Sequence, residues 1–401
     1  MNTSKILLPD EITKILNVLV TTNIIPIIVG GYVRDFFLKI PSKDIDIELY
    51  NVDSLESIMI VLKAFGDVNM VGKSFGVIKL STKNFEIDFS LPRTESKIGH
   101  KHTDFTITTH KNISFKEASS RRDFTINAMG YDFYHDKILD PFNGQKDLEN
   151  RTLDIIYHDR FIEDPLRILR AVQFCARFKL TPTQRLLQLC QKMILNKELQ
   201  YLPKSRIVSE FKKLFLKASI PSIGLTILNK IYHDSLYSSE ICNAVDRLCT
   251  LKVNSYSLFI TLISIMIEKE SYLENYIEGK KSYHDSLELY KYFEKIKNIS
   301  SDYELKKLSC LVKLKDAIDL YKAQYKSTNY ILELENRAKV LNILEHAPQK
   351  IIEGRDLIIL GLTPSKKFSV ILKVIYDAQL KEEFLTHKEG LEWSKKYLES
   401  L

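Results

Sequence analysis

The stretch that decides the fold is IIVGGYVRDFF (27–37), which is followed by KDIDIEL (43–49). An apolar run of strand type ends in two glycines and leads into a helix that we expect to begin near Tyr32. Such a turn places backbone N–H groups at a helix N-terminus, where glycines let a phosphate approach closely. Arg34 would project from the first helical turn toward the same place. A plain tight turn is the commoner cause of a Gly-Gly pair, so the neighbouring motifs decide its meaning.

Two aspartates follow this turn at a spacing of two residues. In a strand, Asp44 and Asp46 would point to one face, while the isoleucines beside them point to the other. Two carboxylates on one face repel each other unless a cation lies between them, and Mg²⁺ prefers such oxygen ligands. The alternative is a strand edge with solvated charges. Asp88, in FEIDFS (85–90), could lie on an adjacent strand or be equally well solvated.

A third motif is SSRRDFTINAMGYD (119–132). Arg121 and Arg122 are adjacent, so on a regular element they would not share a face. We therefore expect one arginine to meet a triphosphate while the other pairs with an acid. Asp123 and the polar residues after it alternate with apolar ones, which indicates a partly buried segment whose polar groups need partners.

A fourth motif is FIEDPLRILRAVQFCARF (161–178). Asp164 as the N-cap, with Pro165 at the first helical position, is a common signal for the start of a helix. Asp164 and Arg167 are three residues apart and can lie on one helical face. From the local sequence alone, capping is the favoured role of Asp164, and the arginines would form a solvated face.

Composition places the chain among ordinary globular proteins. It has 401 residues, 45% of them hydrophobic and 27% charged, with a formal net charge of +7. This mild basicity permits a nucleic-acid partner without establishing one. The five cysteines form no CxxC pair, which disfavours a zinc site. We expect no membrane-spanning segment and a cytoplasmic protein, since the apolar runs are short and the N-terminus lacks a signal-peptide layout.

Strand-like runs and helical patterns alternate over the first 150 residues, and almost every later segment has a helical period. The strand-like runs carry Ile, Val, Phe and Thr, several in alternation. We predict strands at IIPIIV (24–29), IDIELY (45–50), GVIKLS (76–81), FEIDFSL (85–91) and FTITTH (105–110).

The four motifs, in this order, resemble those of the bacterial-type tRNA nucleotidyltransferases, or CCA-adding enzymes, and of the related bacterial poly(A) polymerases. A further stretch, 352–380, resembles a segment near the C-terminal end of these enzymes. The resemblance implies an α+β head with the palm fold of polymerase-beta-like nucleotidyltransferases, a mixed sheet with helices, followed by an all-α neck, body and tail. It implies a head at 1–150, a neck at 151–200, a body at 201–340 and a tRNA-binding tail at 341–401.

The resemblance also implies roles for single residues. Asp44 and Asp46 would be the catalytic pair that binds Mg²⁺, and Asp164 with Arg167 would read the incoming base. Where some members carry another arginine, this chain has Gln173, which leaves one nucleotide contact in doubt. The residues implied to bind nucleotide are Gly30, Gly31, Arg34, Arg122, Asp123, Asp164, Arg167 and Arg170.

Hydrogen-bond polarity supports the base-reading role. A carboxylate only accepts and a guanidinium only donates. Cytosine and adenine each present an amino donor beside a ring-nitrogen acceptor, whereas uracil and guanine present the reverse. An Asp164–Arg167 pair would therefore accept C and A and reject U and G. The implied function is addition of C, C and A to the tRNA 3′ end from CTP and ATP, with release of pyrophosphate. The partner is the tRNA acceptor arm.

Four alternatives stay open at this point. An A-adding enzyme or a poly(A) polymerase would carry the same motifs. A CC-adding enzyme is disfavoured because the segment 89–120, which contains the family's loop for adding the terminal A, has full length. A catalytically inactive RNA-binding relative is disfavoured because Asp44 and Asp46 are both present.

Overall fold

The structure, a computed structural model, describes residues 6–52, 55–71, 76–97, 105–109, 113–365 and 367–400. The chain folds into two compact units, Met1–Ser235 and Leu236–Leu401. The segment 89–120, which we expected to contain the loop for adding the terminal A, lies partly outside the described residues. The structure therefore does not test this expectation.

The first unit is built on a seven-stranded sheet with the order β3-β4-β5-β2-β1-β8-β9. The central pair β2 and β5 is parallel and all other neighbours are antiparallel, which makes the sheet mixed. Strands β6 and β7 pair antiparallel in a separate two-stranded sheet. The strands are β1 Ile25–Val29, β2 Asp44–Tyr50, β3 Asp67–Val71, β4 Val77–Ser81, β5 Glu86–Ser90, β6 Arg93–Lys97, β7 Phe105–Thr109, β8 Gly130–Asp132 and β9 Lys137–Leu139.

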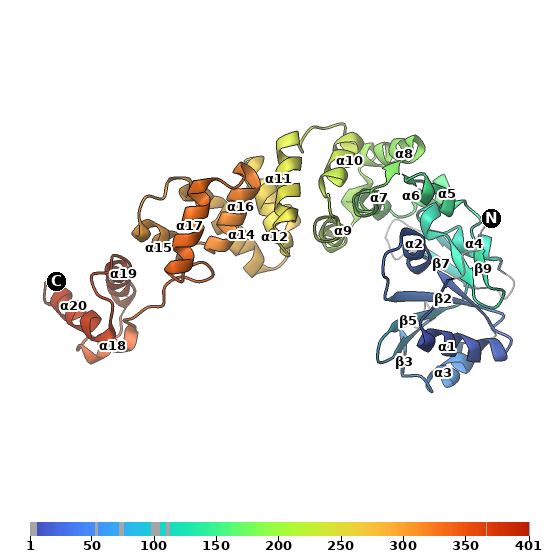
Figure 1. Cartoon of the computed structure of the whole chain (residues 1–401), viewed down its shortest axis with the longest axis horizontal. Coiled ribbons are helices and arrows are strands. Elements are labelled where there is room, and N and C mark those ends of the chain that lie inside the picture. Colours follow the sequence, from blue (N-terminus) through green and yellow to red (C-terminus); the bar gives the residue numbers. More distant parts are fainter. Residues whose placement is uncertain are drawn as a thin grey trace. The chain divides into compact units, whose positions relative to one another are not determined.

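Helices cover the sheet on both sides. Figure 1 shows α1 and α3 on one side of β2 and β5, and α2 on the other. Helix α1 buries four apolar side chains at helical spacing, and removing this apolar face from water stabilises the layer. The helices of this part are α1 Asp10–Thr21, α2 Gly31–Leu38, α3 Leu55–Leu62, α4 Phe115–Ser119, η1 Thr125–Asn127 and α5 Gly144–Glu149.

All five predicted strands are present, each within one or two residues of its predicted ends. The sequence did not predict β3, β6, β8 or β9. Strands β8 and β9 have three residues each, too few for an alternating pattern to be visible. The expected α+β head followed by helices is confirmed.

The rest of the first unit is helical apart from the short pair β10 and β11. Helix α7 packs against α9 and α10, so its buried apolar face lies in the centre of this helical part. The elements are β10 Thr152–Leu153, α6 His158–Ile162, α7 Leu166–Phe178, β11 Thr181–Pro182, α8 Gln184–Leu195, η2 Glu198–Tyr201, α9 Lys204–Lys217 and α10 Ser222–Tyr232.

The second unit consists of helices in its described residues. Its last three helices enclose a small core around Leu357, Ile375 and Phe384. Across the described residues, every helix is too short or too polar to span a bilayer. The helices are α11 Ser239–Thr250, α12 Tyr256–Met266, α13 Ser271–Tyr276, α14 Lys280–Tyr292, η3 Phe293–Asn298, α15 Asp302–Ser309, α16 Leu314–Tyr325, α17 Asn329–Val340, α18 Gly354–Ile359, α19 Lys367–Leu380 and α20 His387–Glu399.

Candidate active site

A polar pocket of about 410 Å³ in the first unit brings together most of the residues that the sequence singled out. It contains all the predicted nucleotide-binding residues and one of the two predicted metal ligands, Asp46. The other, Asp44, is exposed on the same strand outside the pocket lining. The lining residues are Gly30, Gly31, Arg34, Asp46, Arg121, Arg122, Asp123, Asn127, Asp164, Leu166, Arg167, Arg170, Phe174 and Arg206.

The two glycines form one wall of the pocket. Helix α2 begins at Gly31, one residue before the predicted start, and Gly30 precedes it with φ +71° and ψ −123°. A side chain is rarely tolerated in this conformation. A Cβ at Gly30 would also lie 2.7 Å from Nη1 of Arg122, whereas one at Gly31 would meet only an ordinary 3.5 Å contact. The positive φ of Gly30 therefore favours glycine, and a Cβ there would require the guanidinium of Arg122 to shift.

The two aspartates lie on one face of β2, as predicted, and both are exposed. Partial desolvation raises the pKa of the Asp46 carboxyl, and the positive charge of Arg122 lowers it. The negative charges of Asp88, Asp44 and Glu48 raise this pKa further, so that the net shift is upward. Asp88 lies directly beside Asp46 in the parallel register of β2 and β5. Among the described residues, no cluster of three or more potential metal ligands is present, so the pair Asp44 and Asp46 is the group that would share a divalent cation.

The expectation that Arg121 and Arg122 separate is wrong. Their Nη2 atoms both donate to Oε1 of Glu48, at 3.1 Å and 3.2 Å. The two residues lie in a turn between α4 and η1 rather than on a regular element, so no helical or strand period sends them apart. Glu48 is only 1% exposed and follows Asp46 by two residues on the same face of β2. One buried carboxylate therefore anchors both arginines at the pocket.

Arg34 is held in the pocket by three kinds of contact. Its Nε donates to Asp35 at 2.8 Å, and its Nη1 donates to Oδ1 of Asn127 at 2.7 Å. The guanidinium also lies over the ring of Phe178, 4.5 Å from its centroid. Arg34 is 7% exposed, so these partners compensate for a cation removed from water.

Asn127 links Arg34 to a second ion pair. Its amide nitrogen donates to Oδ1 of Asp123 at 2.9 Å, and Oδ2 of Asp123 accepts from Arg170 at 2.7 Å. Burial would raise the pKa of the Asp123 carboxyl, but the charges of Arg170 and Arg167 outweigh it and hold that pKa below its usual value. Since Arg170 lies on α7, this chain of bonds fixes α7 against the edge of the sheet.

Asp164 and Arg167 line the same pocket, one turn apart. Oδ1 of Asp164 accepts from the backbone N–H of Leu166 at 3.1 Å, which is a cap-type bond, and Oδ2 pairs with Arg206 at 3.0 Å. Helix α7 begins at Leu166 with Pro165 as its N-cap, one residue later than predicted. Arg167 donates to two backbone carbonyls, those of Arg160 and Arg121.

Comparison with known proteins adds an independent observation. Residues 27–154 match the family described as the poly A polymerase head domain. This span contains the glycine turn, the two aspartates and the RRD motif. The resemblance predicted from the motifs is confirmed over this span, which contains three of the four motifs, whereas the fourth, at 161–178, lies outside it.

Similar curated proteins carry related names. The chain is 35% identical over 228 residues to the multifunctional CCA protein of Haemophilus ducreyi, covering 56% of this chain and 53% of that protein. It is 37% identical over 204 residues to the CCA-adding enzyme of Blochmanniella pennsylvanica, covering 50% and 47%. The matched region therefore spans about half of each relative.

Solved structures share the fold over nearly the whole chain. The CCA-adding enzyme of Bacillus stearothermophilus in complex with CTP aligns with a TM-score of 0.78 at 19% identity, over 98% of this chain and 99% of that one. The Thermotoga maritima CCA-adding enzyme complexed with tRNA aligns with a TM-score of 0.67 at 20% identity, over 98% and 96%.

The structure shows where Gln173 lies, the residue at which the sequence departs from the pattern of some family members. It is 1% exposed, lies outside the pocket lining and accepts a hydrogen bond from Arg177 at 3.1 Å. The pocket also contains residues that the sequence analysis did not assign to it. Asn127 had a usable signal, a polar residue in an apolar run, whereas Phe174 and Arg206 had none that set them apart from ordinary helix residues.

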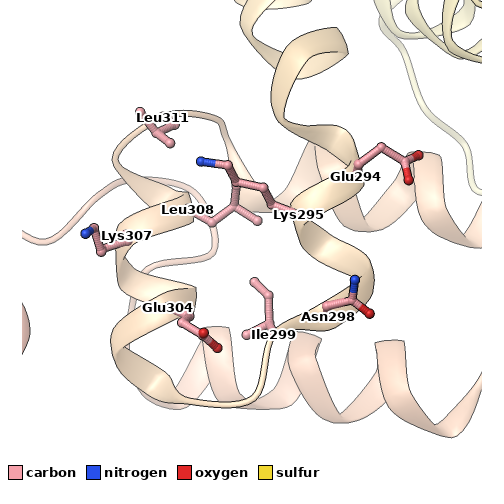
Figure 2. A pocket seen from close by; sticks show the side chains of 8 residues that line it. All are labelled: Glu294, Lys295, Asn298, Ile299, Glu304, Lys307, Leu308 and Leu311. Carbon is pink, nitrogen blue, oxygen red and sulfur yellow. The ribbon is translucent and has the colours of Figure 1, made fainter.

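A second cavity, of about 490 Å³, lies in the second unit (Figure 2). Glu304 belongs to the capping box of α15, and Lys307 pairs with Asp377 at 3.5 Å. Lys295 stacks on Tyr292. None of the residues that the sequence motifs singled out lines this cavity, so the pocket of the first unit is the better candidate for chemistry. Its lining residues are Glu294, Lys295, Asn298, Ile299, Glu304, Lys307, Leu308 and Leu311.

Proposed function

We propose that this protein is a CCA-adding tRNA nucleotidyltransferase that extends the tRNA 3′ end with C, C and A from CTP and ATP and releases pyrophosphate. The observation that carries the proposal is the pocket of the first unit. It joins a phosphate-type glycine turn, a metal-type carboxylate and a base-reading pair within one space. These are the three groups of contacts that a nucleoside triphosphate requires.

The triphosphate would lie against the glycine turn. The N–H groups at the start of α2 and the guanidinium groups of Arg34 and Arg122 supply donors and positive charge there. Asp123 and Arg170 line the same pocket and hold each other through the ion pair described above. Because these groups are already anchored, little side-chain ordering remains to be done when the nucleotide binds.

Asp44 and Asp46 would hold Mg²⁺. Their same-face placement fits a divalent cation, and burial together with the neighbouring carboxylates raises the pKa of Asp46 despite the opposing charge of Arg122. Two carboxylates leave the other coordination positions to water and substrate phosphate oxygens, which is the usual mode of Mg²⁺ binding. Magnesium, when bound, would supply charge stabilisation at the attacking 3′-hydroxyl and at the leaving pyrophosphate.

Asp164 and Arg167 would select the base. Each still has hydrogen-bonding capacity beyond the contacts in the structure, because a carboxylate oxygen has two lone pairs and a guanidinium has five N–H groups. The pair can thus accept the amino group and donate to the ring nitrogen of C or A. The cap-type bond to Leu166 does not exclude this role, since the two functions use different lone pairs.

The named relatives support tRNA, CTP and ATP as partners. Proteins described as CCA-adding enzymes have been solved with CTP, with ATP and with tRNA, and share this fold. On this basis we propose a head at 1–150, a neck at 151–200, a body at 201–340 and a tRNA-binding tail at 341–401. A tRNA-processing role is consistent with a cytoplasmic protein.

The deciding experiment is stepwise incorporation. Purified protein is incubated with Mg²⁺ and tRNA ending at position 73, or already carrying C or CC, with one nucleotide at a time. Addition of two C residues followed by one A supports the proposal. Addition of A to the CC substrate alone would instead identify an A-adding enzyme, and long A tails a poly(A) polymerase.

A further inference from the structure

Asp46, in the candidate active site, begins a row of polar side chains that continues across the sheet. It pairs in register with Asp88 on β5, and Asp88 pairs in register with Lys79 on β4. Residues that pair in register point to the same face of a sheet. The three side chains therefore form a row that runs from the pocket toward the edge strand β3.

The face of β4 and β5 that carries this row is exposed to solvent. The side chains of Lys79 and Asp88 are 44% and 36% exposed. The residues that alternate with them along the two strands are buried on the opposite face, namely Ile78, Leu80, Ile87 and Phe89. At these strands the sheet is therefore packed on one face, while the described residues leave the other face uncovered.

Lys79 has an unusual charge for its position. Among the described residues of β2, β3, β4 and β5, it is the only cation on this face, and its Nζ lies 3.5 Å from Oδ1 of Asp88. The lysine thus leans toward the active site. An ion pair this exposed contributes little to stability, so Lys79 can exchange Asp88 for another anion at small cost. The acids of the face are Asp44, Asp46, Glu48, Asp67, Glu86 and Asp88.

The pocket indicates the side from which the acceptor enters. Its lining residues other than Asp46 belong to the glycine turn, to the segment 121–127 and to the region of α7 and α9, and none of the described ones comes from β3, β4 or β5. A nucleotide in the pocket thus lies on the β1 side of Asp46. In an in-line displacement, the attacking and leaving oxygens stand on opposite sides of the transferred phosphorus. The 3′-hydroxyl of the acceptor therefore approaches from the β5 side, along the row that ends at Lys79.

We propose that Lys79 is an acceptor-binding residue: its ammonium group pairs with the phosphate on the 5′ side of the last tRNA nucleotide while the 3′-hydroxyl of that nucleotide stands at Asp46. One sugar separates this phosphate from the hydroxyl, and two strand spacings, about 10 Å, separate the backbones of Asp46 and Lys79. The lean of Lys79 toward Asp88 shortens that distance. A cation here also offsets the repulsion between the acidic face and the RNA backbone. This inference rests on the proposed function.

The test compares Lys79→Met with Lys79→Arg in the addition of A to tRNA carrying CC. Methionine keeps an unbranched stem without the charge, whereas arginine keeps the charge. For Lys79→Met we expect KM for tRNA to rise about 5- to 10-fold and KM for ATP to stay within about twofold of the wild type. Lys79→Arg should have nearly the wild-type KM for tRNA. An unchanged KM for tRNA in Lys79→Met would overturn the proposal.

Lys63→Met is the matched control. Lys63 is exposed just after the end of α3, which covers the opposite face of the sheet (Figure 1). This substitution removes the same charge from the same unit but leaves the open face intact. Its KM for tRNA should equal that of the wild type. A rise as large as that of Lys79→Met would show that general attraction of RNA, rather than a contact at Lys79, causes the effect.

A modified acceptor tests the phosphate itself. In tRNA carrying CC, the last phosphodiester is replaced with an uncharged methylphosphonate. The wild type should lose as much on this tRNA as Lys79→Met loses on natural tRNA, whereas Lys79→Met should lose less than about twofold more. A structural role of Lys79 would not produce this dependence on the substrate. An equal methylphosphonate effect in both proteins would contradict the contact.

Equilibrium binding of the natural and the modified tRNA keeps this proposal distinct from the proposed function, because binding requires no turnover. A wild type that binds tRNA but adds no nucleotide refutes CCA addition. The difference in affinity between the two tRNAs, compared in the wild type and in Lys79→Met, still tests the contact. A difference that disappears in Lys79→Met supports it, and one that persists unchanged refutes it.

Discussion

At the scale of single residues, Gly30 and Gly31 are adjacent but face different constraints. Gly30 has a positive φ and almost no room for a Cβ, while Gly31 begins a helix and has ordinary space. Only one residue of the Gly-Gly pair is therefore fixed by geometry. This contrast makes the pair a natural test of how the phosphate-type turn supports the pocket.

We expect Gly30→Ala to raise KM for CTP and ATP at least about 10-fold and to destabilise the fold by about 1–3 kcal/mol, because strain and the clash with Arg122 act together. Gly31→Ala is the control and should change either quantity little. Steady-state kinetics and chemical denaturation provide the two measurements. Equal effects from both substitutions would show that the turn geometry does not matter.

Asp46 links metal binding to pH. A carboxyl whose pKa is raised by folding stabilises the folded state only while it is protonated, and this contribution is lost as pH rises through the folded pKa. Asp46→Asn should therefore abolish transfer yet melt at or above the wild-type temperature at neutral pH without divalent metal. The advantage should grow as pH rises above the ordinary pKa of an aspartate and should level off once the Asp46 carboxyl is ionised.

Added Mg²⁺ supplies the control for this substitution. It should raise the melting temperature of the wild type and raise that of Asp46→Asn less, since a ligand that binds only the folded state stabilises it by mass action. Retention of near-normal transfer by Asp46→Asn with Mg²⁺ would rule out the metal assignment.

Glu48 is the buried counter-charge of Arg121 and Arg122. Removing one partner of a buried ion pair leaves the others desolvated without compensation. We expect Glu48→Ala to lower the free energy of unfolding by about 3 kcal/mol. Glu86→Ala, on the exposed face of the neighbouring strand, should change it by less than about 0.5 kcal/mol. Urea denaturation compares the two, and equal losses would contradict the buried-anchor role.

At the scale of elements, α7 contributes several of the residues that line the pocket. Arg167, Arg170 and Phe174 follow each other at spacings of three and four, so they lie on one face, and all three line the pocket. Asp164 stands just before the helix on the same side. The proposed base-reading pair and the ion pair to Asp123 are thus positioned at a single helix.

The role of Asp164 can be separated from capping. Asparagine caps a helix as well as aspartate does, so a pure cap predicts no change for Asp164→Asn. If Asp164 accepts the amino group of the base, the amide can turn and donate, and UTP incorporation should rise. The rise should be partial, because Arg167 still opposes the uracil N–H.

Arg167→Ala completes this prediction. It should depress CTP and ATP incorporation together, since one residue serves both bases. The measurement is incorporation of all four nucleotides on tRNA ending at 73 and on tRNA carrying CC. Wild-type selectivity in Asp164→Asn would favour capping over base reading.

At the scale of the whole molecule, the two units differ in secondary structure. The first holds the sheet and the pocket, while the second is helical in its described residues and carries many lysines. The chain as a whole has a formal net charge of +7, which suits recognition of an RNA by its shape and backbone charge.

We predict that tRNA affinity falls at least about 10-fold between about 50 and 200 mM salt, because bound cations are released from several phosphates on binding. Full-length protein and fluorescently labelled tRNA suffice for the titration. A minihelix whose acceptor-stem base pairs are exchanged should bind within about threefold of the original, since recognition does not read sequence. An affinity independent of salt would contradict this mode of binding.

The sequence by itself determined the order of the motifs, five of the strands and the faces of local pairs. Asp44 and Asp46 share a face because the strand period is two, and Asp164 and Arg167 do so because the helical period is 3.6. These relations depend only on neighbours along the chain. The resemblance to a known family rests on the same short stretches.

The tertiary structure alone decided which distant groups meet. Asp88 lies beside Asp46 because β2 pairs with β5 in parallel, and a local pattern cannot specify strand order. Glu48 binds both arginines, and Arg206 binds Asp164 from 42 residues away. The period of a strand or helix determines which face a side chain occupies, but not which residue it contacts. Packing between elements of secondary structure determines the contacting residue.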